Sequence, residues 1–258
     1  MGDDNVKSYM WVYNCGADSP AGNINGDDTP NIVLDDYQPS RGGKCAVEFL
    51  RGYQGYLGVD GYAGYQLTQA QLVTCLAHIR RKFMEAKKMQ GKNAKVGKAE
   101  WALNHIQKLY RIEKQIKDKT IEERYQVRQA QSLPLFNQFK PWLDKSSLTI
   151  LPESLLGKAV NYAINQWDKF IPYVQDGRID IDNNRSERAI KPFVIGRKAW
   201  LMSQTATGAN ASAVLYSIIE TAKACGLKPY DYLVHVMNKM MEGDVNTNDI
   251  LPWEVTLS

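Results

Sequence analysis

Apolar and polar positions follow two different periods along this chain, and the change of period divides it. The runs Tyr9–Tyr13 and Ile32–Leu34 are dense in aromatic and β-branched residues, so each predicts a strand. The polar stretch 17–31, rich in Gly, Asp, Asn and Pro, predicts the loop of an antiparallel hairpin between them. A helix is expected over 44–50 and a third strand over 56–59.

From Ala70 onward the period becomes helical. Leu72, Leu76, Ile79 and Phe83 recur at the three- and four-residue spacing of a helix that buries one face. Later helices are expected over 97–131, 133–145, 155–170, 209–225 and 229–241. Gly226 and Gly243 follow the last two, as glycine commonly does at helix ends. Strands, a helical block and then mixed structure predict an α/β unit interrupted by helices.

Composition narrows the class of protein. The chain has 258 residues, and none of its apolar runs approaches the roughly 20 residues that cross a bilayer. It also lacks a signal-peptide pattern, so we expect a cytoplasmic protein without a membrane partner. Its four cysteines are scattered and form no CxxC pair, which favours reduced thiols over a disulfide framework or a zinc site.

The charge distribution says more than the net charge of +4. Between Ile79 and Arg128 there are fifteen Lys or Arg residues against six Asp or Glu residues. Such an excess is what a surface that displaces counterions from a polyanion needs. Long helices also carry solvated charges for solubility alone, and the charge pattern does not decide between the two interpretations.

Asp60 is the strongest candidate for a catalytic or metal-binding residue. It ends an apolar strand and precedes Gly61, which allows a tight turn that exposes the carboxylate. Carboxylate oxygen is a preferred ligand of Mg²⁺. Asp-Gly is also one of the commonest turn pairs, so this residue alone does not establish a metal site.

Glu187 is the second candidate. Asp182, Asn183 or Asn184 would cap a short helix that runs to about Lys191, where the following proline limits it. The alternative for Glu187 is an exposed helical ion pair with Lys191, worth about 0.3–0.5 kcal/mol.

The histidines give no metal site by themselves. Cys75 and His78 form a CxxH pair on one helix face, but no further pair of ligands matches it, so a buried thiol and a hydrogen-bonded ring are the simpler interpretation. His105 and His235 are isolated in the sequence.

Three long motifs, in order, resemble those of the insertion sequence 66 family of DDE-type transposases. The strings are Gly58–Tyr65 (GVDGYAGY), Cys75–Phe83 (CLAHIRRKF) and Asp182–Lys198 (DNNRSERAIKPFVIGRK). The first is similar to the family's second-aspartate motif, the second to the helix after it, and the third to its glutamate motif. Ser212–Leu227 is similar to its closing helix.

The resemblance implies an RNase H-like α/β fold, a mixed sheet with an α-helical insertion between Asp60 and Glu187. It implies DNA nicking and strand transfer at element ends, with three carboxylates holding two Mg²⁺ or Mn²⁺ ions. Asp60 and Glu187 match the second and third carboxylates. The residues expected to bind DNA phosphates are Arg80, Arg81, Lys82, Arg185, Arg188, Lys191, Arg197 and Lys198.

The same resemblance sets the expected division of the chain. Residues 1–78 would form the N-terminal part of the core and residues 79–176 the insertion. Residues 177–203 would carry the glutamate, and residues 204–258 would form the closing helices. Besides DNA, the expected partners are a second copy of the chain and helper proteins encoded by the element.

One feature of the family is absent. Its first aspartate lies on a strand in an Asp-Glu-Thr context shortly before the Tyr9–Tyr13 strand, and no Asp-Glu-Thr occurs here. We therefore expect a C-terminal portion of the catalytic domain that is defective on its own. The alternatives are a DNA-binding or regulatory remnant without catalysis, and a purely structural remnant of a decayed element.

Overall fold

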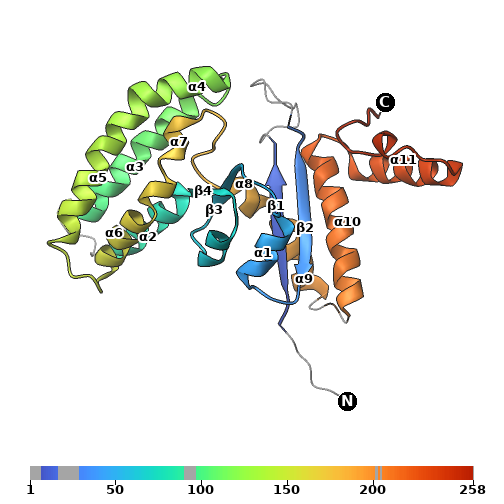
Figure 1. Ribbon diagram of the computed structural model, residues 1–258, viewed down its shortest axis with the longest axis horizontal. Helices are drawn as coiled ribbons and strands as arrows, with labels where there is room; N and C mark the ends of the chain where they lie inside the picture. The colour runs from blue at the N-terminus through green and yellow to red at the C-terminus, as the bar shows by residue number, and fades with distance from the viewer. Residues whose placement is uncertain (1–6, 17–28, 90–96, 201–202, 204, 258) are drawn as a thin grey trace, which may run out of the picture. The chain divides into compact units, whose positions relative to one another are not determined.

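The computed structural model describes residues 7–16, 29–89, 97–200, 203 and 205–257 (Figure 1). The chain forms two compact units, residues 1–41 with 184–258 and residues 42–183. We call the first the hairpin unit and the second the helical unit. The hairpin unit is discontinuous in sequence, because the helical unit is inserted into it. The domain limits expected from the sequence stay predictions.

Both units mix helices with a small two-stranded sheet. The hairpin unit contains β1 (Tyr9–Cys15), β2 (Ile32–Gln38), α8 (Asn184–Ala189), α9 (Lys191–Trp200), α10 (Ala206–Ala224) and α11 (Pro229–Glu242). The helical unit contains α1 (Gly43–Phe49), β3 (Tyr56–Val59), β4 (Gln71–Thr74), α2 (Leu76–Lys88), α3 (Lys98–Gln115), α4 (Ile121–Val127), α5 (Leu133–Ser147), α6 (Leu155–Asn165) and α7 (Pro172–Gln175). The α/β class expected from the sequence is therefore confirmed.

The predicted hairpin is confirmed, and its second strand is longer than expected. β1 and β2 pair antiparallel in a register that places Tyr9 opposite Gln38 and Cys15 opposite Ile32. The β-branched and aromatic residues of both strands suit a pleated, half-buried surface. The predicted loop between them lies largely outside the described residues.

The outer edge of β2 is covered by hydroxyl groups of α10, which lies alongside it (Figure 1). The Thr221 hydroxyl accepts the Val33 N–H at 3.1 Å and donates to the Val33 carbonyl at 2.9 Å. One helical turn earlier, the Ser217 hydroxyl accepts the Asp35 N–H at 2.8 Å. Two residues along a strand span nearly the same distance as four along a helix, so successive turns of α10 serve alternate residues of β2.

The helix predicted from Ala70 onward begins later than expected. Residues 71–74 form β4, which pairs in parallel with β3. Backbone hydrogen bonds from Gln71 to Gly55 (2.9 Å) and from Cys75 to Val59 (3.1 Å) extend the ladder at both ends. The apolar spacing placed the start of the helix too early because Leu72 lies at helical spacing from Leu76 of α2. Pairing with β3 instead holds residues 71–74 in a strand. The predicted strand 56–59 is confirmed.

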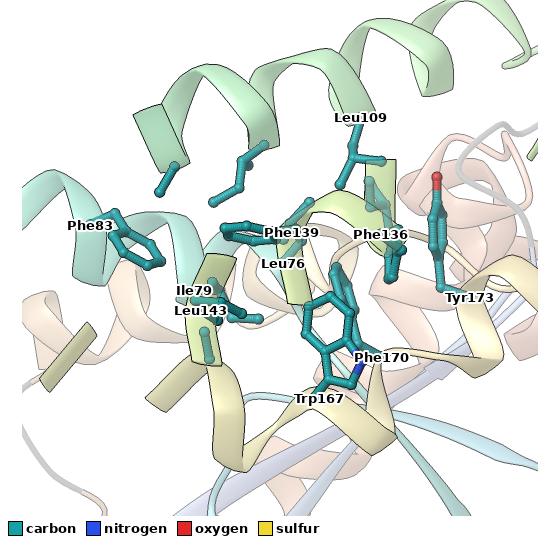
Figure 2. Packing of buried hydrophobic residues seen from close by; sticks show 14 of the residues in the cluster. Leu76, Ile79, Phe83, Leu109, Phe136, Phe139, Leu143, Trp167, Phe170 and Tyr173 are labelled. Carbon is teal, nitrogen blue, oxygen red and sulfur yellow. The ribbon is translucent and has the colours of Figure 1, made fainter. Parts of the chain in front are cut away.

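The hydrophobic core of the helical unit lies between α2, α3, α5 and α6. Figure 2 shows its aromatic centre, in which Phe83, Phe136, Phe139, Trp167 and Phe170 gather beside aliphatic residues of α2 and α3. Phe83 and Phe139 lie 6.3 Å apart between ring centroids, and Phe136 and Phe170 lie 4.8 Å apart. The predicted stripe of Leu76, Ile79 and Phe83 is buried here.

The single long helix predicted over 97–131 is wrong. α3 ends at Gln115, and α4 begins after Thr120, whose hydroxyl and the Glu123 carboxylate form a reciprocal capping box. A π-helical segment, Arg128–Ser132, then joins α4 to α5. It begins at Arg128, whose fully buried guanidinium donates to the Glu113 carboxylate at 3.0 and 2.8 Å.

The helices around the glutamate motif agree with the sequence in part. α8 ends at Ala189, close to the predicted limit, and α9 then starts with Lys191 and carries Pro192 in its first turn. Proline is tolerated there because that N–H has no partner within the helix. α10 and α11 match the two predicted closing helices, and both following glycines, Gly226 and Gly243, have positive φ.

Candidate active site and nucleic-acid interface

Asp60 lies at the carboxyl end of β3, where Gly61 turns the chain sharply. Its carboxylate is exposed, and Oδ1 accepts the Tyr62 N–H at 3.0 Å. The Tyr162 hydroxyl of α6 donates to the Asp60 carbonyl at 2.9 Å. Gly61 has φ +88°, and a Cβ there would lie 2.7 Å from the Tyr162 hydroxyl. The turn that presents this carboxylate therefore requires glycine.

Replacing Gly61 with alanine is expected to lower the free energy of unfolding by about 1–3 kcal/mol, because a left-handed backbone is strained for alanine and Tyr162 must move. Chemical denaturation followed by circular dichroism measures this loss. Gly58→Ala is the matched control, since Gly58 lies on the same strand and a Cβ there meets nothing within 4 Å. Equal midpoints for the two variants would contradict this account of the turn.

The segment that leads into the glutamate motif is fixed beside the end of β4. Ile181 accepts the Leu76 N–H at 3.0 Å, and the Asn183 N–H donates to the Cys75 thiol sulfur at 3.2 Å. The Tyr110 hydroxyl of α3 donates to Asp182 Oδ2 at 2.9 Å. Contacts within the helical unit thus position the residues immediately before α8. Nothing local in the sequence links Tyr110 to Asp182, so sequence reasoning missed this contact, and it missed Tyr162 for the same reason.

Cys75 packs where β4 ends and α2 begins. It is buried at the N-terminal cap of α2, and burial raises the pKa of its thiol above the ordinary value. Within the described part of the chain, no three His, Cys, Asp or Glu residues come together in a group that could hold a metal ion. The buried thiol that the sequence predicts at Cys75 is confirmed, and the hydrogen bond predicted for the His78 ring stays a prediction.

Glu187 lies exposed on α8, which packs against β1 within the hairpin unit. The Ser186 hydroxyl donates to Asn14 Oδ1 at 3.2 Å. Arg185 donates to the carbonyls of Cys15 and Gly16 at the end of β1. These two neighbours hold α8 across the end of the hairpin, and Glu187 follows them directly. Each of the two candidate carboxylates is thus positioned by its own unit.

The predicted phosphate-binding residues differ in their surroundings. Arg185 is engaged with the hairpin carbonyls, a role that the sequence did not indicate. On α2, Arg80 is half-buried, and Arg81 and Lys82 are exposed. Lys82 lies 3.9 Å from the carboxylate of Glu85, three residues further along the same helix.

The remaining predicted cations lie on α8 and α9. Arg188, Lys191, Arg197 and Lys198 are all exposed. They follow Glu187 within the hairpin unit, which suits a surface that binds phosphates near this carboxylate. Their DNA contacts stay a prediction. No helix in the described ranges is long and apolar enough to span a membrane.

Comparison with known proteins identifies the family. Residues 2–211 match the model of the IS66 family of transposases, and residues 217–253 match the IS66 C-terminal element. The uncharacterized protein y4hP of Sinorhizobium fredii is 31% identical over 98% of this chain and 48% of its own length. For the uncharacterized protein y4jD of the same organism, the identity is 31% over 84% of this chain and 44% of that protein.

The chain spans about half the length of the curated relatives it matches. No solved structure matches it. The family model nevertheless covers most of the sequence, including both candidate carboxylates and the whole helical unit. The chain belongs to the IS66 family of transposases.

Proposed function

We propose that this chain is the part of a DNA transposase that supplies two of three catalytic carboxylates, Asp60 and Glu187, for metal-dependent nicking and strand transfer at element ends. The observation that carries the proposal is the presentation of Asp60. An exposed carboxylate at a strand end, on a turn that only glycine fits, lies in a chain that belongs to a transposase family. DNA is the substrate, and the bacterial cytoplasm is the expected compartment.

The residues present suit a hard divalent cation. Asp60 offers an exposed carboxylate. Its Oδ1 accepts a hydrogen bond from the Tyr62 N–H, which leaves lone pairs for a cation. Asp60 and Glu187 would hold Mg²⁺ or Mn²⁺, and bound ions would supply charge stabilisation for phosphoryl transfer. Arg188, Lys191 and the cations of α9 would bind phosphates beside Glu187. Water molecules and the third carboxylate that the family resemblance implies would complete the coordination.

The free edge of β1 supports an RNase H-like fold that another strand completes. Val33 and Asp35 direct their backbone groups away from β1, so their cross-strand partners Asn14 and Val12 direct theirs outward on the opposite side. Within the described residues, the backbone groups of Val12 and Asn14 have no hydrogen-bond partner. A strand bearing the first aspartate, from the part of the relatives that this chain does not span, would pair here. This chain alone would then be catalytically defective.

The test is a transposition assay with the complete transposase that contains this chain. Asp60→Asn and Glu187→Gln are each expected to lower the transposition frequency by about 100-fold or more, since each removes a metal ligand. Binding of element-end DNA should be retained. Asp168→Asn, at an exposed position after α6, is the matched control and should transpose normally. Normal transposition by either site variant would overturn the proposal.

The second candidate is a DNA-binding or regulatory fragment without catalysis. The observation in its favour is the excess of Lys and Arg between Ile79 and Arg128, which suits phosphate binding without any metal ion. The same assay separates the two functions, because a purely binding role requires neither carboxylate. Self-association and helper proteins remain predictions for either function.

A further inference from the structure

The outward face of α3 carries donors and cations but no carboxylate for three turns. The residues of this face are Asn104, Gln107, Lys108, Arg111, Lys114 and Gln115, and all of them are exposed. At 100° per residue they fall within about one third of the helix circumference. The opposite side of α3, including Ile106 and Leu109, is buried in the core. We call these six residues the α3 donor face.

The carboxylates of α3 are engaged elsewhere. Glu113 turns inward to the buried guanidinium of Arg128. Glu100, one turn before the donor face, binds Lys87 at 3.1 Å. Lys108, Arg111 and Lys114 form no ion pair with any described residue.

Three lysines on other helices differ in this respect. Lys140 lies 2.7 Å from Asp144, Lys158 lies 3.1 Å from Glu153, and Lys239 lies 3.0 Å from Glu242. A helix surface that serves solubility alone commonly intersperses both signs of charge. The α3 donor face departs from that pattern, because its own acidic residues are withdrawn from it.

We propose that the α3 donor face binds the sugar-phosphate backbone of duplex DNA, independently of base sequence. The inference rests on the proposed function in that the duplex is the DNA the transposase processes. Lys108 and Lys114 are separated by about 9 Å along the axis of α3. Each strand of a DNA duplex carries a phosphate every ~3.4 Å along the duplex axis. Three flexible cations can therefore reach successive phosphates, while the flanking amides donate to phosphate oxygens.

The test compares two triple variants of this chain in binding to a mixed-sequence duplex, measured by fluorescence anisotropy in EDTA across a salt series. Lys108→Gln/Arg111→Gln/Lys114→Gln is expected to reduce the salt slope of log K by up to about 2.7, since each phosphate contact contributes about 0.9. The loss should be alike for unrelated duplex sequences. Lys140→Gln/Lys158→Gln/Lys239→Gln removes the same net charge from paired lysines and should leave the slope nearly unchanged.

Equal slopes for the two triple variants would overturn the proposal, because net charge alone would then explain the binding. An unchanged slope in the α3 variant would also overturn it, and would identify this face as merely solvated. Unchanged thermal unfolding of both variants excludes misfolding. Binding in EDTA is independent of catalysis. Failure of this inference is therefore distinguishable from failure of the Asp60 and Glu187 proposal, which the transposition assay tests.

Discussion

Replacing Arg128 with methionine is expected to lower the free energy of unfolding by about 3 kcal/mol, because the Glu113 carboxylate loses both guanidinium hydrogen bonds and keeps Arg124, at 3.8 Å, as a more distant cation. The guanidinium is fully buried, and it donates hydrogen bonds in two directions. One side donates to Glu113, and the other donates to the carbonyls of Tyr173 at 3.1 Å and Asp176 at 2.9 Å. The Tyr173 ring lies 4.4 Å from the guanidinium carbon. This single side chain thus joins α3, the π-helical segment and α7.

The measurement is chemical denaturation at neutral pH, followed by far-ultraviolet circular dichroism. Arg111→Met is the matched control, because Arg111 is exposed on α3 and its loss should change stability by less than about 0.5 kcal/mol. The double variant Arg128→Met/Glu113→Leu should recover part of the loss, since it also removes the carboxylate that has lost its guanidinium hydrogen bonds. If Arg128→Met unfolded at the same denaturant concentration as Arg111→Met, the network would not stabilise the helical unit.

Asp35→Asn is expected to stabilise the protein by about 2–4 kcal/mol above pH 7, an unusual sign for a buried polar substitution. Asp35 is only 8% exposed, and neither carboxylate oxygen has a hydrogen-bond partner among the described residues. Burial raises the pKa of this carboxyl from 3.8 to about 7, and the negative charge of Glu220 on α10 adds to the effect. The protein therefore holds a carboxyl whose charged form is disfavoured in the folded state.

The pH dependence identifies the cause. Below about pH 4 the carboxyl is protonated in both folded and unfolded chains, so it has no effect on stability. Between pH 4 and about 7 the unfolded chain is ionised while the folded chain keeps its proton, so stability falls as the pH rises. Asparagine does not titrate, and its advantage should grow over that window and then level off.

Melting temperatures at pH 4.5 and pH 8 measure the difference. Asp36→Asn is the control, because Asp36 is the next residue of β2 and its carboxylate accepts the Gln38 amide at 3.0 and 3.2 Å. A gain for Asp35→Asn that is the same at both pH values would rule out titration of this carboxyl as the cause.

Local patterns predicted the elements that depend on local signals. The hairpin, β3 and the two closing helices followed from residue type, alternation and glycine stops. β4 was missed because a parallel pair forms between segments that only the folded chain brings together. The break after α3 was missed because the apolar stripe hides it, although Thr120 and Glu123 give a visible capping signal.

The candidate site divides in the same way. Asp60 and Glu187 were found from a turn pair and from motifs that resemble a known family. The contact of Tyr162 with the Asp60 carbonyl and that of Tyr110 with Asp182 were not found, because both tyrosines are far from their partners in sequence and carry no motif. Arg185, which the resemblance expects to bind phosphate, donates to the hairpin carbonyls in this structure, a contact that no sequence pattern indicated. The sequence therefore indicated which residues have side chains suited to the site, but not which contacts they make in the folded chain.

The hydroxyl contacts between α10 and β2 have a consequence for the order of folding during synthesis. Ser217 and Thr221 follow their strand partners by 182 and 188 residues, so the hairpin emerges from the ribosome long before the helix that covers its edge. The helical unit is contiguous and is completed in between, so we expect it to fold first. Until α10 arrives, the nascent hairpin offers an open strand edge to neighbouring chains, and ribosome stalling in this interval should favour aggregation.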